Sequence, residues 1–167
     1  MAITPIPWTL LPGPNGTDPF LLENTDVSGS YPLWIMVCPS WRSITHLQIT
    51  AEGTWSQTNN TIGDCSPDGL PEVTSIPKEK LALEDCPPGA LIGKFAGSSV
   101  ALGPATPAAT NPAPAVAEGK AFAIGSYCVV PNPANCIGPL FVGFNGLIRP
   151  IHVVRLSVTV KGAPSGS

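Results

Sequence analysis

The chain of 167 residues is long enough for one domain with a substantial core, carries a net charge of −3 and has only 11% charged residues. Its 8 lysines and arginines do not cluster, which excludes a nucleic-acid surface, because phosphate binding needs several neighbouring cations. No apolar run approaches the roughly 20 residues of a membrane-spanning helix, and 21 prolines with 17 glycines favour short strands joined by turns.

The first 43 residues are punctuated by prolines, with short apolar pieces at 8–11, 20–22 and 33–37. Such pieces form either an extended, proline-rich N-terminal arm that packs on a neighbour or additional strands. Because the first cation is Arg42 and prolines interrupt the early apolar stretch, we expect no Sec-type signal peptide.

Residues 44–55 predict the first well-defined strand. Leu47, Ile49 and Ala51 alternate with polar residues, but the alternation slips by one residue after Ile44. This slip predicts a small β-bulge near the start of the strand.

A long polar loop follows at 56–89, in which 78–83 can make one helical turn, and the apolar segment 90–95 predicts a second strand. Residues 97–119 are rich in proline and alanine, so we expect a long surface loop or contact arm there.

Three further strands are predicted in the last third of the chain, at 122–130, 140–145 and 153–161. Together the elements predict an all-β fold, an antiparallel, jelly-roll-like β-sandwich over residues 44–161. A short C-terminal tail at 162–167 completes the chain.

The five cysteines, at positions 38, 65, 86, 128 and 136, cannot all pair within one chain. Cys128 and Cys136 flank a turn-rich segment, which leaves open a disulfide bond between them. No pair has the Cys-x-x-Cys spacing of a zinc site, and Cys38 is expected to be a small buried hydrophobe.

Catalytic signatures are absent from the sequence. His46 and His152 are isolated, and no serine lies in a Gly-x-Ser-x-Gly elbow, so we expect neither an enzyme nor a cofactor. Asp64, Asp68 and Glu72 recur at four-residue spacing and are weak candidates for a calcium site. That spacing is not the spacing of an EF-hand, and solvated loop carboxylates are the preferred interpretation.

Five segments occur in an order that is shared with a known family. They are residues 49–55 (Ile-Thr-Ala-Glu-Gly-Thr-Trp), 63–69 (Gly-Asp-Cys-Ser-Pro-Asp-Gly), 89–95 (Gly-Ala-Leu-Ile-Gly-Lys-Phe), 140–145 (Leu-Phe-Val-Gly-Phe-Asn) and 153–160. In this order they resemble the bacterial calcium-dependent galactophilic (PA-I type) lectins, a resemblance that implies a small jelly-roll sandwich.

The chain differs from those lectins at their calcium site. An Asn-Asp pair ends their penultimate strand, and a loop with further asparagines helps to hold the calcium. Here the pair is Asn145-Gly146, and residues 147–152 contain no carboxylate or amide, although calcium takes six to eight oxygen ligands. The resemblance therefore implies a lectin-like fold whose calcium site is lost, with Trp55, Asp64, Asp68 and Asn145 as candidate contacts for a glycan or a protein partner.

The low charge content indicates a surface that is largely covered by partners, because soluble monomers normally carry more charge. We therefore expect a non-catalytic structural or assembly protein that forms homo-oligomers, most simply a virion component such as a capsid decoration or tail protein. The alternative is a lectin-like carbohydrate-binding module that attaches to a glycan surface, with four tryptophans available for stacking or for the core. Either function places the chain on a virion or an extracellular surface.

Overall fold

A computed structural model describes residues 8–14, 20–27, 34–57, 65–69, 83–95, 120–133, 136–145 and 151–164. These residues form strands and turns and contain no helix, and therefore none that could span a membrane. The strands are β1 (Thr9–Leu10), β2 (Phe20–Val27), β3 (Ile35–Cys38), β4 (Ile44–Gln57), β5 (Leu91–Phe95), β6 (Phe122–Ala123), β7 (Tyr127–Pro131), β8 (Leu140–Phe144) and β9 (Ile151–Pro164).

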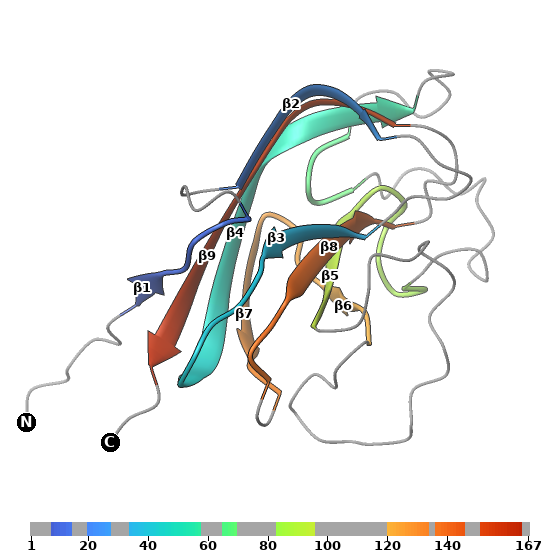
Figure 1. Cartoon of the computed structure of the whole chain (residues 1–167). Helices are drawn as coiled ribbons and strands as arrows, with labels where there is room; N and C mark the ends of the chain where they lie inside the picture. Colours follow the sequence, from blue (N-terminus) through green and yellow to red (C-terminus); the bar gives the residue numbers. More distant parts are fainter. Residues whose placement is uncertain are drawn as a thin grey trace, which may run out of the picture.

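The strands make two antiparallel sheets. The large sheet has the order β1-β9-β4-β7, and β2 also pairs with β9. Its centre is the pair of 14-residue strands β4 and β9, which run side by side along their whole length (Figure 1). The small sheet has the order β3-β8-β5-β6.

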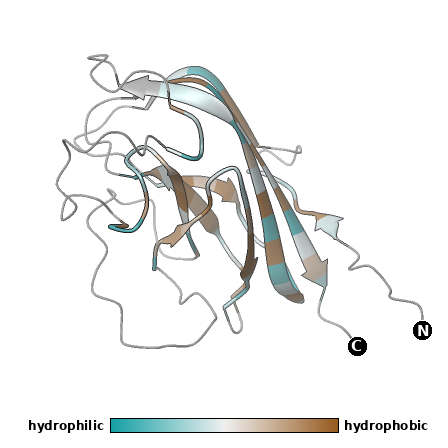
Figure 2. Cartoon of the chain, turned by 180° about the vertical axis from the view of Figure 1, so that it is seen from behind, coloured by the Kyte–Doolittle hydropathy of each residue, from teal (hydrophilic) through white to brown (hydrophobic). Residues whose placement is uncertain are grey.

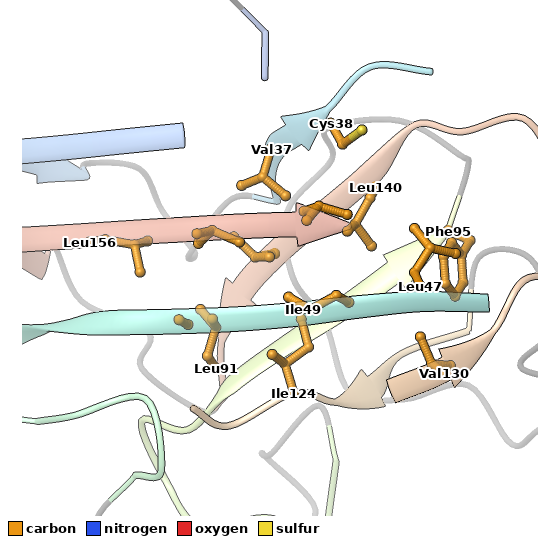
Figure 3. Packing of buried hydrophobic residues seen from close by; sticks show 14 of the residues in the cluster. Val37, Cys38, Leu47, Ile49, Leu91, Phe95, Ile124, Val130, Leu140 and Leu156 are labelled. Carbon is orange, nitrogen blue, oxygen red and sulfur yellow. The ribbon is translucent and has the colours of Figure 1, made fainter. Parts of the chain in front are cut away.

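The hydrophobic core lies between the two sheets. Figure 3 shows Leu47 and Ile49 of β4 beside Leu91 and Phe95 of β5 and Leu140 of β8, all of them fully buried. The alternation of apolar residues along β4 and β9 places one set of side chains in this core and the other set on the outer face. The predicted all-β sandwich is confirmed.

Two irregularities shape the long strands. The register of β4 against β9 shifts between Ile44 and His46, where the sequence predicted a bulge. A second shift lies between Thr54, which pairs with Arg155, and Trp55, which pairs with Val153. Val154 is therefore an extra residue on β9. Both shifts keep the core-facing residues turned inward on either side of them.

Some predicted boundaries need correction. Residues 122–130 form two short strands, β6 and β7, because Gly125 adopts a φ of 64° and turns the chain between them. Of the two alternatives for the first 43 residues, the structure has the additional strands, β1, β2 and β3, whereas the last strand, β9, continues past its predicted end to Pro164. The predicted loop at 97–119 and most of the predicted turn at 78–83 lie outside the described residues.

No disulfide bond joins any of the five cysteines, all of which lie in the described part of the chain. The bridge between Cys128 and Cys136 that the sequence left open therefore does not form. Cys38 is fully buried, as expected, and burial raises the pKa of its thiol to about 11.

The outer faces of the two sheets differ. On the small sheet, Trp34, Ile92 and Phe141 are buried, and the ammonium of Lys94 lies 5.1 Å from the ring centre of Trp34 and 5.3 Å from that of Phe141. Burial lowers the pKa of Lys94. On the large sheet the outer face is open to solvent, and hydrophilic and hydrophobic residues alternate along its long strands (Figure 2).

Candidate functional site

Trp55 lies in the core, with none of its surface exposed. Its indole N–H donates to the carbonyl of Gly89 at 3.1 Å, and its ring centre lies 4.7 Å from that of Phe144. Two backbone hydrogen bonds between Trp55 and Cys65 tie the segment 65–69 to β4. The ring is therefore inaccessible to a sugar or a protein partner in this fold, and Trp55 acts as a packing residue.

Asn145 is also fully buried, directly after β8. Its side-chain nitrogen lies 3.0 Å from the carbonyl oxygens of Leu83 and Cys86 and 3.2 Å from that of Pro87, and its side-chain oxygen accepts from the N–H of Leu83 at 2.9 Å. An amide group has donor hydrogens as well as an acceptor oxygen, whereas a carboxylate has acceptors only. This position therefore suits asparagine. Asn145 holds the loop 83–90 in place and is not available to a ligand.

Asp68 is exposed in the turn at 65–69, beside the turn before β7. One carboxylate oxygen accepts from the backbone N–H of Ser126 at 3.0 Å, so it connects the two turns. Asp64 and Glu72 lie outside the described residues. Within the described ranges, no group of three His, Cys, Asp or Glu side chains could hold a metal ion.

The surface that stands out is the outer face of the large sheet. Register places the side chains of alternate residues on this face, because their neighbours in β4, β7 and β9 point into the core. Four large apolar side chains lie exposed on it, two on each flank: Leu10 (41%), Leu21 (47%), Tyr127 (59%) and Val129 (46%).

The central row of this face is uncharged. Thr50 of β4 pairs directly with Thr159 of β9 and with Tyr127 of β7, and Gln48 lies beside Lys161 and Val129 in the next row. A neutral polar centre flanked by apolar side chains is inexpensive to desolvate compared with a charged surface. We name this surface the outer face: Leu10, Leu21, Glu23, Gln48, Thr50, Glu52, Thr54, Tyr127, Val129, Arg155, Ser157, Thr159 and Lys161.

Sequence reasoning did not single out this surface. In Tyr127-Cys128-Val129-Val130 both alternating sets are apolar, so the pattern alone does not reveal which set faces solvent. The neighbouring Thr50 and Thr159 resemble ordinary surface strand residues. The signal that was available is the scarcity of charge, which predicted a covered surface without locating it.

No family model matches the sequence, and no curated protein matches it, so the function of the chain has to be inferred from its sequence and from the chemistry of this face.

Proposed function

We propose that this chain is a non-catalytic structural subunit that assembles with other protein subunits, as a capsid-decoration or tail protein of a virion. The observation that carries the proposal is the group of four exposed apolar side chains on the outer face. Exposed apolar side chains that gather on one face of a folded domain are typical of interaction sites.

The chemistry of the surrounding surface supports the same function. The outer face carries four charged side chains, Glu23, Glu52, Arg155 and Lys161, but none lies in its central threonine row, and the interior of a protein–protein interface is depleted of charge in the same way. Sandwich domains also serve as building blocks of viral capsids, which is an argument from fold analogy. A subunit with one open sheet face whose central row is neutral is suited to a repeating particle.

The proposal is tested by the oligomeric state of the purified chain and by the presence of the chain in virus particles. We expect sedimentation velocity to show a species larger than a monomer at micromolar concentration, and mass spectrometry to find the chain in purified virions from its source. A chain that stays monomeric over the whole concentration series and is absent from particles would overturn the proposal. A glycan array run with and without chelator serves as the control, because specific sugar binding would favour the carbohydrate-binding alternative instead.

A further inference from the structure

The charged side chains of the outer face are arranged in an informative way. Glu23 of β2 lies directly opposite Arg155 of β9, so these two opposite charges are cross-strand neighbours. Glu52 instead lies opposite Ser157, and Lys161 lies opposite Gln48. Among the described residues of this face, Glu52 and Lys161 are therefore the charged side chains whose directly opposite neighbours on β9 and β4 are neutral, and Arg155 is the diagonal neighbour of Glu52.

Glu52 and Lys161 are placed symmetrically about the centre of the face. Thr50 and Thr159 pair directly in the middle; Glu52 follows Thr50 by two residues on β4, and Lys161 follows Thr159 by two residues on β9. Because the strands are antiparallel, the acid and the base lie on opposite sides of this threonine row. At about 3.3 Å per residue and 4.8 Å between strands, they are roughly 14 Å apart, too far to pair within one chain.

Such an arrangement is self-complementary. A two-fold axis that runs across the strands at the threonine row, between two copies packed back to back with outer face against outer face, exchanges the two ends of the face. It brings the Lys161 end of one copy over the Glu52 end of the other, twice in the same interface, as the symmetry of an isologous dimer requires. Stacked sheets that cross at about 30° allow this superposition of β4 and β9.

We infer that the partner bound by the outer face is a second copy of this chain, packed back to back about a two-fold axis, with Lys161 of each copy facing Glu52 of the other. The inference rests on the proposed function and names its partner. The threonines meet at the centre of this dimer, and the apolar residues of both flanks lie around them.

The size of the face is close to that of a stable dimer interface. The strands of the large sheet contain 43 residues, which at about 3.3 Å by 4.8 Å each cover roughly 680 Å² in plan. Stable complexes bury about 800 Å² on each partner. Most of the outer face would therefore be buried in such a dimer.

Charge reversal tests the pairing. Lys161→Glu and Glu52→Lys each place like charges in contact twice, so each should weaken self-association at low salt by about tenfold or more. The double variant Glu52→Lys/Lys161→Glu restores opposite charges and should regain most of the wild-type affinity. Sedimentation equilibrium measures all four proteins, with Lys120→Glu as the control, because Lys120 is exposed and lies outside the outer face. Circular dichroism melts verify that each variant is folded.

The outcomes separate this inference from the proposed function. If the wild type self-associates but Lys161→Glu behaves like Lys120→Glu, or if the double variant stays as weak as the single variants, the back-to-back dimer is overturned and assembly through another surface stands. If the wild type is monomeric at every concentration, the back-to-back dimer is overturned, and the proposed function falls with it only if the chain is also absent from particles. Weakening by each single reversal together with recovery in the double variant supports the inference.

Discussion

Asn145 makes more side-chain hydrogen bonds than any other described residue, and its removal should destabilise the fold strongly. In Asn145→Ala the partly buried carbonyls of Leu83, Cys86 and Pro87 lose their donor, and a buried polar group without a partner costs roughly 1–3 kcal/mol. We expect the free energy of unfolding, measured by urea denaturation, to fall by about 3–5 kcal/mol.

Asn132→Ala is the matched control for this prediction. The Asn132 side chain is half-buried and donates to the carbonyls of Ile44 and Cys136, so it has fewer bonds to lose. Its replacement should cost about 1–2 kcal/mol. Equal losses at the two positions would contradict the role of Asn145 as the residue that holds the loop.

The thiols should differ in reactivity, because burial sets both their access and their ionisation. Cys38 is fully buried with a pKa raised to about 11, so at pH 8 its thiolate fraction is very small. Burial also raises the pKa of Cys86 and Cys128, but both are only half-buried. We expect native-state alkylation at pH 8 to label Cys86 and Cys128 before Cys38, as resolved by peptide mass spectrometry.

Full alkylation of the unfolded chain without reductant should add five labels, since no disulfide bond is present. The same alkylation of a protein that contained the Cys128–Cys136 bridge would add only three. The labelling of all three thiols should accelerate as the pH is raised, but at about pH 10 Cys38 should still be mostly un-ionised, because its pKa is about 11. Labelling of Cys38 first in the native state would contradict its burial.

The pairing of β4 with β9 depends on a glycine. A β-carbon at Gly53 would collide with the backbone carbonyl oxygen of Arg155 on the paired strand, and Gly53 has a φ of 152°. Gly53→Ala should therefore lower the free energy of unfolding by about 3 kcal/mol.

Gly93→Ala in β5 is the matched control, because it adds the same methyl group to a glycine in another strand. Its β-carbon would first meet the side-chain ends of Ile124 and Phe122, at 2.7 and 2.9 Å, which can move more easily than a backbone. We expect a smaller cost of about 1 kcal/mol by the same denaturation measurement. A Gly93 variant less stable than the Gly53 variant would show that the contact with β9 is not the limiting one.

Strands in which polar and apolar residues alternate were predictable from the sequence. The boundary between two strands was not predictable where the residues on both sides of the turn are apolar. The alternation around Leu47 and Ile49, and around Val158 in the last strand, identified β4 and β9 together with the bulge after Ile44. The run 122–130 is apolar on both sides of Gly125, so periodicity did not reveal the turn that separates β6 from β7.

At the candidate sites, the sequence identified unusual residues but not whether their side chains point to the surface or to the interior. Trp55 and Asn145 were expected as contact residues, whereas the structure turns both toward the interior, because the loop 83–90 folds over the ends of β4 and β8. Direction depends on which segment covers a strand end, and such long-range packing leaves no local pattern. For the same reason, the exposure of Tyr127 and Val129 on β7 depends on the small sheet, which packs against the opposite face of that strand.

The whole molecule has one covered and one open sheet face, and a final prediction follows from this difference. Tyr127 is the most exposed apolar side chain of the outer face, so Tyr127→Lys removes apolar area and adds a charge that an interface must desolvate. Burying such a side chain is worth about 1.5–3 kcal/mol, and 1.4 kcal/mol corresponds to tenfold in affinity, so self-association should weaken by about tenfold or more. Ile137→Lys is the matched control, because Ile137 is equally exposed (62%) but precedes β8, away from the outer face. Sedimentation equilibrium should show weaker association for Tyr127→Lys alone, with unfolding midpoints of both variants close to that of the wild type. Equal weakening by both substitutions would indicate that general surface hydrophobicity, and not this face, drives the assembly.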